Sequence, residues 1–440
     1  MTTTTATTTT ASPSIWRWLA AAAPPLAIGL WALLDDVEGL NTGWFVFSWT
    51  AYLIVLDGLL HALGGRSWWL HRRRELGALL WWSVPFWFVF EVYNLVLLNW
   101  YYVAAPRDER LQALFAGVAF ATVLPACFFH ADVVSRTRVG RWQCRPRRAP
   151  RGLVAALWVV GVVFLVVPVL LPRQTFWMIW GALLVVPDLI NRRLGAQSLL
   201  RDLEEGRLDR VASLLIGGLC AGGAWESLNF FARTKWLYTV PGFEHVKLFE
   251  MPVLGFVGFP LLALEAFASY TLLCVVLRGG RSYARDDVDQ PRVPLRHRRR
   301  LLAAVVVSSV AMTALPLERS LFSVRAVLEE VPGVDVVIAE RLRGCGIGTP
   351  EALARDGVVC AGIDDAVLAR AHDGAALVVH KGLGADEAHL LTAAGIDSIA
   401  DLAQQDPAPL TSTLQRLAHD RGVAAPPAAL VRLQVAAARR

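Results

Sequence analysis

Long apolar runs alternate with short polar segments along the first 317 residues of the chain. Each run approaches the ~20 apolar residues that a helix needs to cross the roughly 30 Å hydrocarbon core of a bilayer. This pattern predicts an all-α, polytopic membrane protein. The predicted spans lie near residues 15–34, 44–63, 76–98, 111–134, 152–171, 175–190, 211–231, 252–277 and 301–317.

Composition supports the membrane assignment. Hydrophobic residues make up 55% of the 440, with 17 Trp and 19 Phe, and the mean hydropathy is +0.45. These values exclude an ordinary soluble protein of this size. The chain has no CxxC motif and no His and Cys cluster with metal-ligand spacing, so we expect neither a metal nor another cofactor.

The charged loops predict an orientation. Arg and Lys number 24 in the loops at 64–75, 135–151, 191–210 and 278–300, but six in the intervening loops. The positive-inside rule then places the N-terminus in the cytoplasm. Nine spans put the C-terminal region outside, whereas eight leave it inside; the "RHRRR" before the last run favours nine. The 40 Arg against three Lys suggest a bacterial source, and therefore the plasma membrane.

The two halves of the membrane region repeat one spacing. Tryptophan, aspartate and serine follow one another at intervals of 8 and 10 residues in both halves, and a proline and an ionisable residue recur further on. Four spans per half is an even number, so we expect parallel repeats with a site between them. The matched positions are Trp49, Asp57, Ser67, Pro125 and His130 in the first half and Trp180, Asp188, Ser198, Pro260 and Glu265 in the second.

Polar residues inside the spans are the candidate catalytic groups. A carboxylate at bilayer depth costs at least ~2.5 kcal/mol, so such residues usually face a cavity or a partner. Each half carries a glutamate and an asparagine at i and i+3, on one helix face, and a further glutamate stands in "FPLLALEAF". The alternative is that these groups only join helices to one another. The candidates are Glu91, Asn94, Glu226, Asn229 and Glu265, which we expect to converge on one cavity.

Aromatic residues follow each glutamate motif, in "FEVYNLVLLNWYYV" and "WESLNFFARTKWLYTV". One interpretation is that Trp100, Tyr102, Trp236 and Tyr238 line a substrate site. The other is that they form an aromatic belt at the outer membrane interface.

Two resemblances follow from these motifs. The run "WESLNFFARTKWLYTVPGFEHVKLFEMPVLGFVGFPLLALEAFASY" resembles an uncharacterised family of bacterial multispanning proteins. The W-x-Y element with a Pro and a Glu on the next helix is similar to the membrane-embedded lycopene cyclases and carotenoid hydratases. That resemblance implies protonation of a polyene double bond by Glu226 or Glu265, with aromatic faces stabilising the carbocation.

The C-terminal region differs from the rest in charge and pattern. Residues 324–440 carry net charge −4, against +10 for residues 1–323. "VPGVDVVIAERLRGCGIGTPEALA" repeats as "HKGLGADEAHLLTAAGIDSIADLA" at a spacing of 49, which looks like tandem units of the helix-hairpin-helix family. That resemblance implies a phosphate contact at a hairpin.

The details of the hairpins weaken a nucleic-acid function. The second hairpin keeps the favourable residues Lys381, Gly382 and Gly384, but Asp335 interrupts the first. The negative charge also opposes binding to a polyanion. We therefore expect a protein partner or a structural role for this region rather than nucleic acid. Cys345 and Cys360 could pair if it lies outside.

These observations lead to one architecture and three functions. The leading hypothesis is an enzyme that acts by acid catalysis on an apolar isoprenoid- or carotenoid-like lipid. The alternatives are a transporter or channel that uses the carboxylates, and a membrane scaffold whose tail recruits a protein. The predicted parts are a disordered N-terminal tail (1–14), membrane repeat 1 (15–138), a basic linker (139–151), membrane repeat 2 (152–278), a basic loop (279–300), a ninth span (301–323) and the tandem C-terminal domain (324–440).

Overall fold

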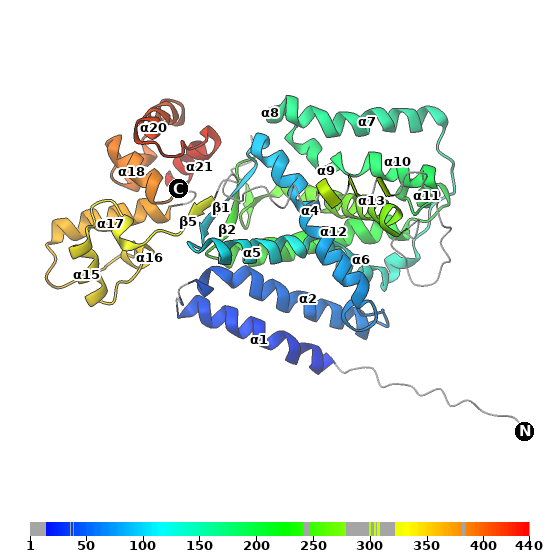
Figure 1. Cartoon of the computed structure of the whole chain (residues 1–440), viewed down its shortest axis with the longest axis horizontal. Helices are drawn as coiled ribbons and strands as arrows, with labels where there is room; N and C mark the ends of the chain where they lie inside the picture. The colour runs from blue at the N-terminus through cyan, green and yellow to red at the C-terminus, as the bar shows by residue number, and fades with distance from the viewer. Residues whose placement is uncertain are drawn as a thin grey trace, which may run out of the picture.

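The computed structural model is mainly α-helical (Figure 1). It describes residues 15–35, 37, 39–240, 246–278, 299–300, 303–304, 306–308, 322–380 and 383–439. Within these ranges, seven helical segments are long and apolar enough to cross a membrane, as expected of an integral membrane protein. They are Ile15–Leu34, Leu40–Ala62, Arg73–Leu97, Glu109–Ser135, Arg151–Leu170, Asp209–Phe231 and Val253–Leu277.

The two halves of the membrane region have a similar order of elements as far as one strand, and differ after it, where a helix follows in the first half and two short strands and a 3₁₀ helix follow in the second. The first half contains α1 (Ile15–Leu34), η1 (Leu40–Gly43), α2 (Trp44–Ala62), α3 (Trp68–His71), α4 (Arg73–Leu97), β1 (Trp100–Ala105), α5 (Glu109–Ala121), α6 (Val123–Ser135) and the short turn η2 (Arg138–Arg141). The second contains α7 (Arg151–Leu170), α8 (Pro172–Thr175), η3 (Phe176–Met178), α9 (Ile179–Ala182), α10 (Val185–Leu194), α11 (Leu199–Glu204), α12 (Asp209–Phe231), β2 (Lys235–Tyr238), β3 (Lys247–Leu248), β4 (Met251–Pro252), η4 (Val253–Val257) and α13 (Gly258–Arg278).

The predicted span at 175–190 is not one helix, and that prediction needs correction. The segment is divided into η3, α9 and α10, with a non-helical backbone at Trp180. Pro187 explains much of the break, because its missing N–H cannot bond the carbonyl of Leu183, four residues earlier. The sequence predicted a single span because residues 176–187 form a continuous apolar run. The predicted span at 301–317 lies mostly outside the described residues.

An aspartate organises the same turn in each half. Asp57 accepts hydrogen bonds from Ser67 Oγ at 2.5 Å and from the N–H of Trp68 at 2.8 Å. Asp188 accepts from Ser198 Oγ at 2.9 Å and from the N–H of Leu199 at 2.7 Å. The repeated spacing therefore encodes a buried cap for the short helix that follows.

Glycines let α12 approach its neighbours. A Cβ atom at Gly217 would lie 2.6 Å from the N atom of Ala131 in α6, and one at Gly218 would lie 2.5 Å from the O atom of Phe259 in α13. Small residues at these positions permit the close helix packing that is common in membranes. Helix α12 thus packs against an element of each half.

A three-stranded sheet lies at one end of the helical bundle, between the bundle and the C-terminal region (Figure 1). Strands β1 and β2 are antiparallel, and Trp100 pairs with Tyr238, while Tyr102 pairs with Trp236. Strand β5 (Phe322–Val324) adds to the other edge of β1 in parallel. Its pairing and the cluster of Tyr101, Leu237, Leu430 and Leu433 attach the C-terminal region to the membrane region.

The C-terminal end of α13 and strand β5 lie at opposite ends of the bundle. Near the end of α13, Val275 packs with Ala196 in one of the arginine-rich loops. Strand β5 instead pairs with β1, at the end where Figure 1 shows the C-terminal helices.

The C-terminal region has its own hydrophobic core and two similar hairpin units. Gly346 and Gly395 both adopt φ of +78°, and each follows a short helix. The next residues, Ile347 and Ile396, donate back to Leu342 O at 2.9 Å and Leu391 O at 3.0 Å. The elements are η6 (Leu328–Glu330), α15 (Val336–Gly344), α16 (Pro350–Leu353), α17 (Asp365–Val379), α18 (Ala385–Ala393), α19 (Ile399–Ala403), α20 (Pro407–Arg421) and α21 (Ala428–Ala438).

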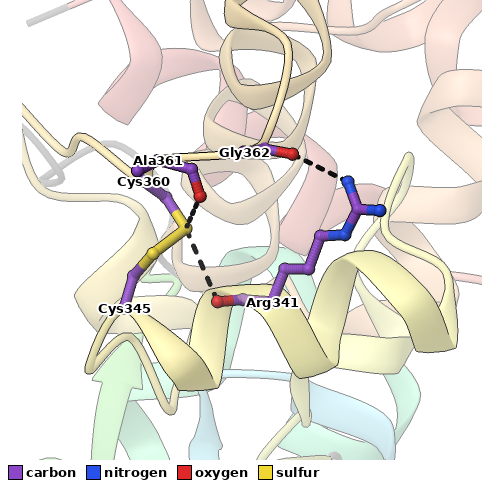
Figure 2. The surroundings of a disulfide bond; sticks show 5 residues. All are labelled: Arg341, Cys345, Cys360, Ala361 and Gly362. Carbon is purple, nitrogen blue, oxygen red and sulfur yellow. Dashed lines mark hydrogen bonds between the residues drawn. A yellow bond between two sulfur atoms is a disulfide. The ribbon is translucent and has the colours of Figure 1, made fainter.

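A disulfide joins the end of α15, the first helix of the first unit, to the loop that follows α16. Cys345 and Cys360 are bonded, as Figure 2 shows. Beside them, the Arg341 side chain donates to Gly362 O at 2.7 Å, so the same loop is held at a second point. Such bonds persist in oxidising compartments.

Candidate functional site

An apolar cavity of about 110 Å³ lies where the two halves meet. Its walls come from α2, α4–α6, α9, α12, α13 and both strands of the ribbon, which we define as β1 and β2. Aromatic side chains form much of these walls, and we call this space the aromatic cavity. All four predicted aromatic residues, Trp100, Tyr102, Trp236 and Tyr238, line the cavity, together with Phe45, Trp87, Trp180 and Trp225.

The first half supplies a glutamate whose acceptor oxygen is surrounded by aromatic donors. Glu91 is buried, and its Oε1 accepts from Trp87 Nε1 at 2.8 Å, from Trp100 Nε1 at 3.2 Å and from Tyr102 Oη at 2.5 Å. The other oxygen, Oε2, is buried and has no hydrogen-bond partner among the described residues. One side of the carboxyl group is therefore fixed, and the other is free to carry a proton.

The second half repeats this arrangement. Glu226 is fully buried, and its Oε1 accepts from Tyr238 Oη at 2.7 Å and from Trp236 Nε1 at 3.2 Å. Trp236 Nε1 also lies 2.9 Å from Tyr238 Oη. Again Oε2 has no partner in the described part of the chain. We call the two groups the glutamate–aromatic clusters.

The asparagines hold the strands in place. Asn94 Nδ2 donates to Trp100 O at 2.7 Å, and its Oδ1 accepts from the N–H of Asn99 at 2.8 Å. Asn229 contacts both backbone groups of Trp236, at 2.9 and 3.1 Å. The i, i+3 spacing thus lets a helix carry a carboxyl for the aromatic side chains and an amide for their backbone. The asparagines position residues and do not line the cavity.

The expectation that Glu91, Glu226 and Glu265 face one cavity needs correction. None of them is among the described residues that line it. The carboxyls of Glu91 and Glu226 lie behind the aromatic side chains, which separate them from the cavity. The hydrogen bonds that the Trp and Tyr side chains donate to these carboxyls offset part of the desolvation cost of burying them.

Glu265 serves the broken helix instead. Its Oε1 accepts from the N–H of Leu183 at 3.0 Å, while Ser269 Oγ, one turn further along α13, donates to Leu183 O at 2.8 Å. Together they satisfy both backbone groups that the break releases. Irregular backbone at membrane depth requires such partners.

Several lining residues were not predicted as site residues. Trp87 and Trp225 lie four residues and one residue before their glutamates, and Trp180 was recognised only as a repeat position. The W-x-Y spacing was itself a signal, because residues two apart share one face of a strand. Lys235 also lines the cavity and forms an ion pair with the buried Glu250 at 3.3 Å.

Of the predicted phosphate-binding residues, only Gly384 is described, and it does not line this cavity. Lys381 and Gly382 lie outside the described residues, and Gly384 precedes α18 as its N-cap. In the described ranges, no three His, Cys, Asp or Glu residues come together in a group that could hold a metal ion.

Comparison with known proteins identifies one region. Residues 332–439 match a family model described as "Domain of unknown function (DUF4332)". No curated protein and no solved structure matches the chain.

Proposed function

We propose that this integral membrane protein binds an apolar, isoprenoid-like lipid in the aromatic cavity and acts on it by acid catalysis. The observation that carries the proposal is the pair of glutamate–aromatic clusters, whose rings line the cavity while their polar ends bind a buried carboxyl. Apolar walls suit a hydrocarbon chain, and aromatic faces stabilise a carbocation.

The tyrosine hydroxyls are the natural route for a proton. Tyr238 Oη donates to Glu226 Oε1 and Tyr102 Oη donates to Glu91 Oε1, and both tyrosines line the cavity. At rest each hydroxyl donates to the carboxyl; in the reaction it gives its proton to one carbon of a double bond and takes a proton from the carboxylic acid. The resulting carbocation returns a proton from a neighbouring carbon to the same relay. The net change is an isomerisation or ring closure, which needs no co-reactant.

The test is turnover of an isoprenoid or polyene lipid by the purified protein in lipid nanodiscs. Tyr238→Phe and Glu226→Gln should each lower the rate by at least ~100-fold, a typical contribution of acid–base catalysis. Tyr93→Phe is the matched control, because its hydroxyl donates to Leu165 O and it does not line the cavity. Equal rates in all three variants would refute the relay.

The membrane orientation forms part of the proposal. We place the arginine-rich loops in the cytoplasm of a bacterium and the C-terminal region on the other side of the plasma membrane. Support comes from the opposite positions of the α13 end and β5, and from the Cys345–Cys360 disulfide. Reporter fusions at residues 145 and 440 should give opposite results; a cytoplasmic result at both positions contradicts it.

A transporter is the second candidate, because one observation favours it. The helix is broken between α9 and α10, and Glu265 accepts a hydrogen bond from the N–H of Leu183 at the break. This arrangement resembles the discontinuous helices of transporters. Lipid or proton flux in proteoliposomes, without chemical change of the lipid, would select this candidate over the enzyme.

A further inference from the structure

A second cavity of about 410 Å³ lies between the ribbon and the C-terminal region. Its walls carry four side chains that are cationic at neutral pH and one carboxylate, Glu351. Glu351 lies 3.5 Å from the Nε atom of Arg325. Cations therefore outnumber anions among the described residues that line it. The cationic residues are Arg233, Lys235, Arg325 and Arg355.

The ribbon separates this cationic cavity from the aromatic cavity. Along β2, Trp236 and Tyr238 line the aromatic cavity, whereas Leu237 lines the cationic one. This alternation follows from the two-residue period of a strand. Lys235, at the start of β2, lines both cavities, so the two spaces share a border there.

A helix terminus adds to the cationic cavity. Leu383 and Gly384, which precede α18, line it, and Gly384 has no side chain to cap the helix. A Cβ atom at Gly384 would lie 2.6 Å from Ser323 Oγ, so a side chain there would displace the serine hydroxyl from its hydrogen bond to Leu383 O. The first N–H groups of a helix favour a nearby anion. The N-terminus of α18 and the arginines therefore both favour a bound anion, although they come from separate parts of the chain.

We propose that the cationic cavity binds the phosphate headgroup of a lipid whose isoprenoid-like chain occupies the aromatic cavity. This inference rests on the proposed function and narrows it to an anionic amphiphile. Guanidinium groups bind phosphate oxygens through charge-assisted hydrogen bonds. The apolar chain would pass the shared border at Lys235, a residue that lines both cavities.

The experiment compares three probes on the full-length protein in nanodiscs. Farnesyl monophosphate carries both parts, farnesol lacks the phosphate, and inorganic phosphate lacks the chain. Quenching of tryptophan fluorescence reports occupancy of the aromatic cavity, and calorimetry reports binding of each probe. Farnesyl monophosphate should bind at least about tenfold more tightly than farnesol, since a hydrogen bond to a charged group is worth that much.

Substitution of two arginines of the cationic cavity tests whether the phosphate headgroup binds there. Arg233→Gln with Arg355→Gln should reduce farnesyl monophosphate binding to the level of farnesol, while leaving farnesol binding unchanged. Arg233→Lys keeps the charge and should retain part of the preference. Arg416→Gln is the matched control, because Arg416 is exposed and lines neither cavity.

Different outcomes overturn different claims. Equal binding of farnesol and farnesyl monophosphate, with quenching by both, refutes the headgroup inference and leaves the proposed function standing. Binding of inorganic phosphate as tight as that of farnesyl monophosphate, with the same arginine dependence, shows a site for free phosphate and refutes a lipid source. The absence of quenching by either lipid contradicts the proposed function itself.

Discussion

The two halves of the membrane region share three hydrogen-bonded arrangements of polar side chains and differ in a fourth. Both have the aspartate cap, the glutamate–aromatic cluster and the asparagine that holds a strand. At the equivalent positions Tyr52 and Leu183, however, the first half has an intact helix and the second a broken one. His130 Nε2 lies 2.7 Å from Tyr52 Oη, whereas Glu265 accepts the N–H of Leu183.

This difference separates two kinds of buried carboxyl. Glu91 and Glu226 occupy equivalent positions and present the same oxygen to the same aromatic types. Glu265 has no carboxylate counterpart, and its partner is the backbone. The two repeated glutamates therefore bind aromatic residues that line the cavity, whereas the glutamate without a counterpart supports a local break.

The largest expected effect tests whether Glu265 supports the broken helix, in contrast to the two repeated glutamates. Glu265→Leu leaves the N–H of Leu183 without an acceptor in an apolar interior, which should cost about 3 kcal/mol or more. His130→Leu removes a side-chain contact and should cost ~1 kcal/mol. The measurement is thermal unfolding of the detergent-solubilised protein. Glu265→Gln, which keeps an acceptor, is the control; equal losses for the two leucine variants would erase the distinction.

The asparagines should be equally important in the two halves. Asn94→Leu and Asn229→Leu each leave buried backbone groups of the ribbon unsatisfied, at a cost of about 2–3 kcal/mol. The same thermal assay applies, with an exposed residue, Ser412→Ala, as the control. A large loss in only one half would show that the shared hydrogen bonds do not carry equal weight.

The two C-terminal hairpin units allow a similar comparison through pH. Burial raises the pKa of Glu387 to about 8, whereas Ile338 occupies the equivalent place in the first unit. Between about pH 4.3, the usual value for Glu, and pH 8, the folded state keeps a proton that the unfolded state releases. Stability should therefore fall as pH rises through this range.

Glu387→Gln should remove that pH dependence and stabilise the C-terminal region at pH 9, where the wild type has lost the contribution of its protonated carboxyl. Urea unfolding of residues 325–440, followed by circular dichroism at pH 5, 7 and 9, measures it. Gln434, which donates to Glu387 Oε2 at 2.9 Å, retains an acceptor in the variant. A parallel decline in the variant would assign the pH dependence to another group.

The smallest effect concerns the asymmetry at the ribbon, where β5 pairs with the first half alone. Arg107 Nη1 lies 2.6 Å from Glu330 Oε2, and the Arg107 guanidinium lowers the pKa of Glu330. Both side chains are substantially exposed, so Arg107→Gln should cost less than ~1 kcal/mol. Hydrogen exchange at β5 should accelerate slightly, and high salt should produce the same change in the wild type. Detachment of the C-terminal region would show that the pair matters more than exposed ion pairs do.

The sequence predicted the elements that local pattern encodes. The helical class followed from the apolar runs, and the repeat followed from equal spacing of Trp, Asp and Ser. The i, i+3 rule placed Glu226 and Asn229 on one helix face. Those inferences needed only the period of a helix and the width of a bilayer.

The rest depended on contacts between distant segments. The break at Leu183 is sustained by Glu265, 82 residues away, and no local pattern specifies that partner. Whether a glutamate faces the cavity or lies behind it depends on the path of the strand that follows. Tyr238 donates a hydrogen bond to Glu226 only because the ribbon returns across the helix. The sequence alone was therefore compatible both with an aromatic belt that faces lipid and with the wall of a cavity.

The register of the ribbon makes each half self-complementary. Trp100 pairs with Tyr238 and Tyr102 with Trp236, so exchanging the halves leaves the pairing unchanged, with Tyr101 and Leu237 at its centre. Two copies of a half-length polypeptide would form the same ribbon as a homodimer, with two equivalent outer edges. In this chain β5 occupies one edge, and β2 is the remaining edge strand of that sheet among the described residues. Attachment of the C-terminal region therefore makes the two edges of the ribbon unequal. Strand β5 covers the edge of β1, whereas β2 ends the sheet on the other side.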